Sequence, residues 1–198
     1  FIDVRLFGGV SAVEKKKFNL PGPVQFGIGK SLHPVKENFI KGTGAFATKE
    51  GAQQKTFREE YNITYGLIAF HGVINENAAR NTGLKQDDVD WLLKGIWQGT
   101  KDLLSRSKKG HMPRLLLKID YTDCYFVGDL LDRLKLDSKG KEEQAFDSPK
   151  DFAVNVSELN QALKKAEKLG RLHAVSVLKD DNLELSEEIY NAQELVLK

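Results

Sequence analysis

Histidines and carboxylates are the side chains of this 198-residue sequence that could perform acid–base catalysis or bind a metal. The histidines are His33, His71, His111 and His173. They lie far apart and lack the short spacing typical of metal ligands. Adjacent carboxylates such as Asp87 and Asp88 have diverging side chains, so helix capping or a solvated surface explains them better than catalysis. We expect no catalytic residue, no metal site and no cofactor.

A glycine-rich segment, Gly27-Ile28-Gly29-Lys30-Ser31, has the residue types of a phosphate-binding loop. Its glycines lie too close to Lys30 for the spacing of a nucleoside-triphosphate loop, which makes that kind of site unlikely. The Lys30 ammonium and the Ser31 hydroxyl can still donate hydrogen bonds to a nucleic-acid phosphate.

Cations and aromatic rings gather in three segments that together favour single-stranded RNA as the ligand. The first holds Gln25, Lys30 and Ser31, the second is residues 36–60, and the third is residues 105–109 with Arg114. Cations neutralise phosphates, and exposed rings stack on unpaired bases. For the basic residues that follow a helix, pairing with the helix dipole is the alternative interpretation.

The charge is distributed unevenly along the chain. Residues 1–118 contain 19 Lys and Arg and 11 Asp and Glu, a net 19 − 11 = +8. Residues 119–198 contain 11 Lys and Arg and 17 Asp and Glu, a net charge of 11 − 17 = −6. We expect the basic part to meet a polyanion, and the acidic part to meet the basic part of another copy in head-to-tail assembly.

One cysteine and the absence of a long apolar run limit the class of protein. Cys124 is the single cysteine, which excludes an internal disulfide, and we expect it to be buried or half-buried on a strand. No apolar stretch is long enough to span a membrane, and a reducing cytoplasm fits this composition.

Residues 36–60 are polar and glycine-rich, and they are too long for an inert connection. A turn at 49–51 predicts that the two flanks pair as a projecting β-hairpin. Elsewhere we expect strands at 21–33, 61–73, 113–121, 152–156 and 172–178, with 61–73 largely buried. We expect helices from Asp87 or Asp88 to Gly110 and from Ser157 to Leu169, and loops at 10–20 and 137–150.

The order of these elements is strand, projecting segment, strand, helix and strand. This predicts an α+β fold in which two further elements ahead of Phe1 would complete a ferredoxin-like topology, the arrangement of RNA-recognition motifs. The sheet of such a domain often presents its face to single-stranded RNA.

A series of ordered motifs resembles the large backbone subunit of type I CRISPR Cascade complexes, closest to the type I-B branch. The motifs are Asp3–Gly8, Gly22–Phe26, Lys30–Leu32, Gly42–Phe46, Tyr65–Ala69, Trp97–Thr100, Ser105–Lys108 and Pro113–Leu117, and residues 152–178 resemble the C-terminal part of the family. Family members begin with a strand and an Asn-Pro-Asn-Gly-Asp-like segment that this sequence lacks, so we expect an N-terminal strand to be missing.

The resemblance implies a non-catalytic subunit that binds CRISPR RNA in antiviral defence. It implies a ferredoxin-like palm over 1–136 with a β-hairpin thumb at about 36–60, and a C-terminal extension over 137–198 that packs on the palm. Copies would line up head-to-tail on one guide RNA beside other Cascade subunits, each thumb flipping out one base. Target DNA would pair with the bases between, without any membrane contact.

Carried onto this sequence, the resemblance and the chemistry assign RNA contacts to a set of residues. They are Arg5, Gln25, Lys30, Ser31, Lys41, Phe46, Lys49, Lys55, Arg58, Arg106, Lys108 and Arg114. For Arg5 and Arg114, internal salt bridges are the alternative. An RNA endonuclease of the type III kind is the alternative function, but its thumb-region aspartate has no counterpart, because residues 36–60 contain glutamates and no aspartate.

Overall fold

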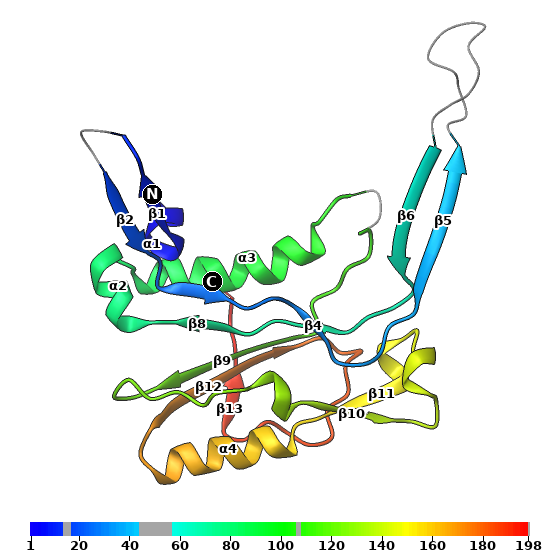
Figure 1. Cartoon of the computed structure of the whole chain (residues 1–198). Coiled ribbons are helices and arrows are strands. Elements are labelled where there is room, and N and C mark those ends of the chain that lie inside the picture. The colour runs from blue at the N-terminus through cyan, green and yellow to red at the C-terminus, as the bar shows by residue number, and fades with distance from the viewer. Residues whose placement is uncertain (14–16, 44–56, 106–107, 198) are drawn as a thin grey trace, which may run out of the picture.

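The computed structural model describes residues 1–13, 17–43, 57–105 and 108–197 as a mixed fold of helices and small, mainly antiparallel sheets (Figure 1). It begins with the helix α1 (Ile2–Phe7), followed by the antiparallel pair of β1 (Gly8–Ser11) and β2 (Phe18–Pro21). The sequence predicted a loop at 10–20. This prediction is wrong at both ends of the range, because residues 10–11 belong to β1 and residues 18–20 to β2. Backbone pairing from Gly8↔Pro21 to Ser11↔Phe18 forms there despite the lysine-rich composition.

A narrow ladder of short strands runs through the middle of the chain. β3 (Val24–Phe26) pairs with β8 (Gly72–Ile74), and β4 (Lys30–Ser31) pairs with β7 (Ile68–Ala69). From the pair Phe26↔Gly72 to the pair Lys30↔Ala69, the segment with β3 and β4 advances four residues (30 − 26). The segment with β7 and β8 covers the same stretch in three (72 − 69). That offset is a β-bulge, and it interrupts the continuous strands that the sequence predicted.

Residues 61–73 are largely exposed where the sequence predicted burial. Tyr61 is 71% exposed and Phe70 64% exposed, so the prediction of a largely buried strand at 61–73 is wrong. β-branched and aromatic residues favour strands whether or not a second layer covers them, so composition alone does not report burial.

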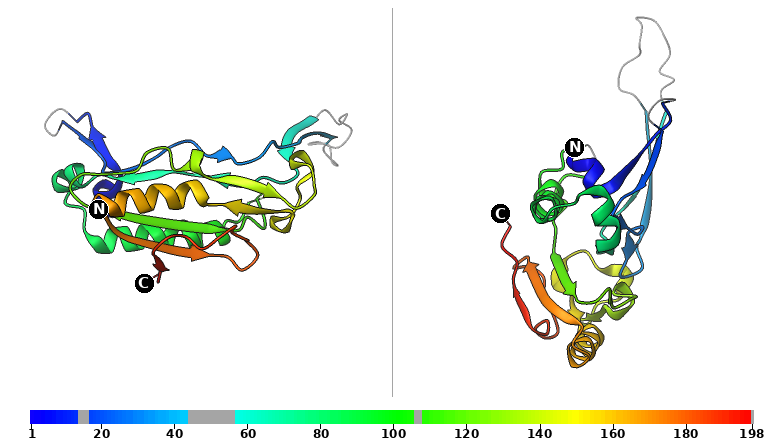
Figure 2. Two further views of the ribbon diagram at one scale, coloured as in Figure 1. Left: turned by 90° about the horizontal axis from the view of Figure 1, so that it is seen from below. Right: turned by 90° about the vertical axis from the view of Figure 1, so that its left-hand side faces the viewer.

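The segment around 36–60 forms a hairpin stem, as predicted. β5 (Glu37–Thr43) pairs antiparallel with β6 (Phe57–Ile63), in a register from Glu37↔Ile63 to Thr43↔Phe57. The stem rises from the body of the molecule at the end opposite to β1 and β2 (Figures 1 and 2). The predicted turn at 49–51 lies outside the described residues.

Two helices follow the ladder. α2 (Glu76–Thr82), which the sequence did not reveal, is capped by the Asn75 side chain, which accepts from the backbone N–H groups of Asn77 and Ala78. The predicted helix is α3 (Gln86–Lys101), and its N-cap is Lys85 rather than an aspartate. It ends well before the predicted end at Gly110, and Leu104, which lies beyond its last residue, is 93% exposed.

The C-terminal half contains a three-stranded sheet in the order β13–β12–β9. β12 (Leu172–Lys179) pairs antiparallel with β9 (Leu115–Tyr121) and parallel with β13 (Ala192–Glu194). The strands predicted at 113–121 and 172–178 are thus confirmed.

A second pair and a helix complete this half. β10 (Lys135–Ser138) pairs with β11 (Phe152–Asn155), and α4 (Ser157–Lys168) follows directly, as predicted. Its N-cap is Val156, because the Ser157 hydroxyl donates to Asn155 Oδ1 instead of capping the helix.

The core of the C-terminal half is tightly closed. Phe152, Val156 and Leu163 are fully buried, and Val175 is 1% exposed. Leucines and Ile119 of β9 pack against this cluster, so strands on both sides of position 136/137 share one core. β10 itself spans that position, where we expected the division between palm and extension.

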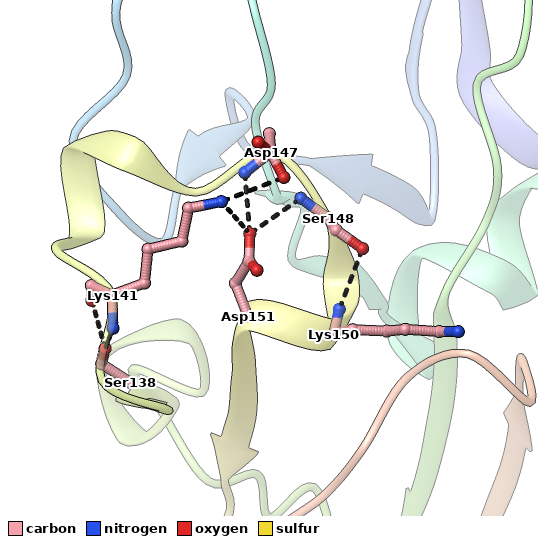
Figure 3. Close-up of polar contacts among 6 residues, drawn as sticks. All are labelled: Ser138, Lys141, Asp147, Ser148, Lys150 and Asp151. Atoms are coloured by element: carbon pink, nitrogen blue, oxygen red, sulfur yellow. Dashed lines mark hydrogen bonds and ion pairs between the residues drawn. The ribbon is translucent and has the colours of Figure 1, made fainter.

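The sequence predicted a loop at 137–150, which is wrong at 137–138 because β10 includes them. Much of the segment that follows is held by one carboxylate (Figure 3). Asp151 Oδ2 accepts from the backbone N–H of Asp147 at 2.9 Å, from that of Ser148 at 3.1 Å and from Lys141 Nζ at 3.0 Å. The bond from the Asp147 N–H and then that from Lys141 lower the pKa of Asp151. Lys150 points away from this cluster (Figure 3).

Cys124 lies on an exposed turn rather than on a buried strand. Its φ of 56° places it in the left-handed region, beside Asp123 with φ 53°. The expectation of a half-buried strand cysteine is therefore wrong, because β9 ends at Tyr121 and the chain turns immediately after it.

Candidate nucleic-acid interface

Two hairpins rise on the same side of the ladder, at its opposite ends. The pair β1–β2 stands at one end and the stem β5–β6 at the other, while β3, β4 and β8 run between them (Figure 1). The ladder therefore connects the two hairpins. Several of the predicted RNA-binding residues lie along it.

Gln25 is exposed on β3 and lines a shallow hollow of about 350 Å³. The hollow is lined by Gln25, Phe26, Gly27, Ile28, His71, Val73 and Leu131. Gln25 pairs across the ladder with Val73, and the Gly27 N–H donates to the His71 carbonyl at 2.9 Å. Since side chains alternate along a strand, Gln25 and Phe26 point to opposite faces of the ladder.

Lys30 forms an exposed ion pair with Asp132, with 2.8 Å between Nζ and Oδ1. Their mutual hydrogen bond raises the pKa of Lys30 and lowers that of Asp132. Both side chains are about two-thirds exposed, at 64% and 65%, so solvent screens the pair and it holds weakly. The neighbouring Ser31 hydroxyl donates to the His33 carbonyl at 2.6 Å, and its hydrogen is turned inward.

The hairpin stem carries cations beside carboxylates and rings. Lys41 Nζ lies 3.5 Å from Glu59 and 5.3 Å from the centre of the Phe39 ring, and Arg58 pairs with Glu60. The rings of Phe39 and Tyr61 lie 4.8 Å apart across the two strands. Phe39 is 45% exposed, so the stem offers aromatic surface as well as charge.

Arg5, whose side chain is 31% exposed, is held by a two-pronged ion pair. Its Nε donates to Asp88 Oδ2 at 2.7 Å and its Nη2 to Oδ1 at 2.5 Å, and Asp88 is 3% exposed. The hydrogen bond from Arg5 lowers the pKa of Asp88 to about 2. Asp88 also accepts from the Lys85 N–H, so the pair joins α1 to the start of α3.

Arg114 likewise donates from Nη1 to Asp180 Oδ1 at 2.6 Å. Burial alone would raise the pKa of Asp180, but the bond from Arg114 and that from the Asn182 N–H outweigh it and lower the pKa. The alternative expected for Arg5 and Arg114, internal salt bridges, thus matches the geometry of both.

The remaining predicted residues fall into two groups. Lys108 is exposed beyond α3, and its backbone N–H donates to Ser105 Oγ at 3.1 Å. Phe46, Lys49, Lys55 and Arg106 lie outside the described residues. The structure therefore places Gln25, Lys30 and Ser31 on the ladder, and Lys41 and Arg58 on the stem at one end of it.

Sequence reasoning missed the exposed ring of Phe70 and the carboxylate of Asp132. The signal for the ring was present in Gly29, because a glycine opposite an aromatic residue in a ladder often marks close approach. Asp132 lies 102 positions from Lys30, and nothing local to either residue indicates the pairing.

A larger hollow of about 830 Å³ lies on the C-terminal half. Its lining includes Lys139, Lys150 and Lys179, and also Asp181, Glu184, Glu187 and Glu188. Carboxylates outnumber cations there, so this hollow suits a phosphate strand less well than the ladder does.

Neither a cluster of metal ligands nor a helix that could cross a membrane occurs in the described ranges. No group of three or more His, Cys, Asp or Glu side chains in those ranges could hold a metal ion. None of the helices that the structure describes is long and apolar enough to cross a membrane.

Comparison with known proteins identifies relatives of the chain. Residues 1–157 match the family model of CRISPR-associated protein Cas7. Over 173 residues the chain is 38% identical to a curated protein of Haloferax volcanii, named CRISPR-associated protein Cas7, with 84% of this chain and 49% of that protein covered. The chain thus spans about half the length of that relative.

Two solved chains share the fold at low sequence identity. One, from a structure titled CRISPR RNA-guided surveillance complex, pre-nicking, has a TM-score of 0.58 and 16% identity, covering 99% of this chain and 53% of that one. Another, titled CRISPR RNA-guided surveillance complex, has a TM-score of 0.56 and 14% identity, covering 98% and 72%.

Proposed function

Because this chain belongs to the Cas7 family of CRISPR-associated proteins, we propose that it is a guide-RNA-binding backbone subunit of a type I Cascade complex. In this role several copies would assemble head-to-tail on one CRISPR RNA, beside other Cascade subunits, in antiviral defence. The observation that carries the proposal is the open ladder, with Gln25 and Lys30 on it and the cation-bearing stem at its end.

This arrangement suits a ligand that is held by its backbone. Contacts to phosphates carry no sequence information, so one protein surface can hold any guide. Target DNA would be selected by base pairing with the guide rather than by the protein. The basic N-terminal part and the acidic C-terminal part supply complementary surfaces for head-to-tail contacts.

We assign the ladder and its neighbouring elements to a ferredoxin-like palm over residues 1–136, and the stem β5–β6 to its thumb. In support, the chain runs from the ladder through the hairpin to the ladder again, then through α3 to β9. Residues 137–198 form the extension, which packs on the palm through the shared sheet β13–β12–β9.

The same proposal gives the subunit no catalytic role and places it in the cytoplasm. Residues 36–60 contain glutamates but no aspartate to act as the nucleolytic residue of a type III subunit. Incubation with magnesium and RNA paired to a guide should leave the RNA intact. Regularly spaced cuts that an Asp→Ala substitution abolishes would establish the endonuclease alternative instead.

Among the predicted contacts, Gln25, Lys30, Lys41 and Lys108 are exposed enough to meet RNA directly. In this proposal Arg5 and Arg114 hold other elements in place and do not contact RNA, because their guanidinium groups pair with Asp88 and Asp180. Arg5 fixes α1 against α3, and Arg114 fixes the start of β9.

The salt dependence of RNA binding tests the proposal. A triple variant with Lys30, Lys41 and Lys108 changed to Ala should bind single-stranded RNA more weakly. Its slope of log K against log salt should be shallower by about 0.7 for each phosphate that the variant no longer neutralises. A control triple variant with Lys150, Lys165 and Lys168 changed to Ala removes the same charge from the C-terminal half. Equal slopes in the two variants would contradict the assignment.

A further inference from the structure

A buried histidine lies where the ladder meets the hairpin stem. His33 is 6% exposed and lies between β4, which ends at Ser31, and β5, which begins at Glu37. On the other segment, Tyr65 and Leu67 lie between β6 and β7. Buried polar side chains are almost always hydrogen-bonded, so the partners of His33 indicate what it holds in place.

The imidazole of His33 completes the last hydrogen-bonded pair of the ladder. In a regular antiparallel pair of this kind, two residues exchange two backbone hydrogen bonds. The Leu32 N–H donates to the Leu67 carbonyl at 2.9 Å, but the return bond from the Leu67 N–H goes to His33 Nε2 at 3.2 Å. Pro34 follows and has no N–H with which to extend the ladder. The side chain of His33 therefore ends the ladder in place of a backbone group.

The two hydrogen-bond partners of the imidazole determine its tautomer. A ring nitrogen that accepts from a backbone N–H carries no proton, so Nε2 is the unprotonated nitrogen. Nδ1 lies 2.8 Å from the carbonyl oxygen of Pro34, which can only accept, so Nδ1 carries the proton. We assign the neutral Nδ1–H tautomer to His33 from this network. Both of its nitrogens are then satisfied by backbone groups.

The same ring packs into the core of the C-terminal half. It stacks on Tyr65 with 5.8 Å between the ring centres, and it meets Phe146 edge-on at 5.3 Å. The ring of Phe152, which is fully buried in that core, lies 6.4 Å from it. His33 thus contributes one ring to the core while its nitrogens bond the end of the ladder.

The core residue Phe146 is itself held in position by the carboxylate of Asp151. This carboxylate accepts from the backbone N–H groups of Asp147 and Ser148, which directly follow Phe146 (Figure 3). Phe146 is 3% exposed. Because its neighbours are fixed by these bonds, Phe146 gives the imidazole a rigid packing partner.

We infer that His33 is a positioning residue that fixes the ladder and the base of the stem against the C-terminal core. The inference rests on the proposed function, in which cations on the ladder and on the stem contact one strand. Groups that are in place before binding lose less conformational freedom when the strand binds, which favours affinity. Without the imidazole, the Leu67 N–H would lose its partner, and fewer molecules would have the arrangement that binds RNA.

Three substitutions separate this role from a contribution to stability alone. His33→Phe keeps a ring in the core and removes both hydrogen bonds. His33→Gln keeps an acceptor that can reach the Leu67 N–H, and it serves as the conservative rescue. Val175→Ala, at a site 1% exposed on β12, is the control for stability lost from the same core. Urea denaturation measures the stability of each variant.

Spin labels report the position of the stem relative to the C-terminal half. In a background with Cys124→Ser, Asn62→Cys on the stem and Lys168→Cys at the end of α4 carry the labels, and both sites are exposed. Pulsed electron–electron double resonance should give one narrow distance distribution for this background and for Val175→Ala. His33→Phe should broaden the distribution, because the end of the ladder is no longer bonded.

Binding to a single-stranded RNA of mixed sequence should follow the distance distributions. We expect His33→Phe to bind roughly fivefold more weakly, His33→Gln to recover most of that loss and Val175→Ala to bind like the unchanged protein. Long-range proton–nitrogen NMR spectra of the unchanged protein at neutral pH should show the proton of His33 on Nδ1. The resonance is assigned by its absence from the His33→Gln spectrum.

Four other results would contradict parts of this account. A proton on Nε2 would exclude the bond from Leu67 and overturn the inference, even if no variant folded. A narrow distribution with unchanged affinity in His33→Phe would mean that the ring only fills space. An equal loss of affinity in Val175→Ala would mean that binding follows stability. If the unchanged protein bound no single-stranded RNA, the proposed function would fail, while the tautomer and the label distances would still decide whether His33 holds the stem.

Discussion

The two halves of this chain use the same kinds of residues in opposite ways. In residues 115–197, Phe152 and Leu163 are fully buried and rings pack against one another around a closed core. In residues 17–43 and 57–75, Phe70 and Ile28 are exposed at 64% and 96%, and each lies between two short strands of two-stranded sheets. Apolar surface that is buried within the chain stabilises the fold, whereas apolar surface left in water remains available to a ligand.

Charge follows the same division. The basic residues of the N-terminal part lie beside its open strands, while the carboxylates predominate after residue 118. A surface built for a polyanion needs cations and rings that are accessible to solvent, and a closed core leaves neither accessible. The comparison therefore assigns stability to one half and recognition to the other, and each assignment can be broken by substitution.

The largest expected effect is the loss of a core side chain. Leu163→Ala should lower the free energy of unfolding by about 2–5 kcal/mol, because the fully buried leucine would leave a cavity. Ile28→Ala, the matched change on the ladder, should alter it by less than about 0.5 kcal/mol. Urea denaturation of both variants measures the difference. Similar losses would mean that the ladder is as important to the fold as the core is.

A smaller effect is expected at the pair that joins α1 to α3. Asp88→Asn should lower Tm by roughly 5 °C at neutral pH, because Arg5 would lose its partner at a buried site. Asp87→Asn, an exposed neighbour, is the control.

The same pair predicts the pH dependence of stability. The pKa of Asp88 is lowered to about 2, so folding favours its ionised form. The contribution of Asp88 to the free energy of unfolding is complete above about pH 4 and is lost as the pH falls toward 2. The gap in Tm between the unchanged protein and Asp88→Asn should therefore close over that interval. A gap that persists at pH 2 would contradict the ion pair.

The smallest effect concerns the competition for Lys30. Asp132→Asn should free the ammonium and raise the affinity for single-stranded RNA up to about fivefold, since an exposed pair contributes at most about 1 kcal/mol. Titration at low salt gives the best resolution, and Asp129→Asn serves as the control on the same loop. Weaker binding by Asp132→Asn would show that the pair orients Lys30 instead of competing for it.

Local patterns in the sequence were sufficient for the regular elements of the C-terminal half. The apolar spacing that predicted α4 and the strands around it reflects burial on one side, and burial is what the structure shows there. The same signal was misleading at 61–73, where β-branched and aromatic residues line an exposed surface.

The candidate site could be predicted only in part for a related reason. Gln25, Lys30 and Lys41 were found because glycine and basic residues surround them in sequence. Asp132, the partner of Lys30, comes from a distant loop, and the fold alone brings them together. The Arg5–Asp88 pair spans 83 positions, so a residue that appeared suited to phosphate has an internal partner.

Crosslinking of bound single-stranded RNA, followed by peptide mapping, tests the division between the halves most directly. We predict crosslinks in residues 22–36, 37–63 and 103–114, with few after residue 137. Crosslinks concentrated in residues 137–197, with none on the ladder, would contradict the account.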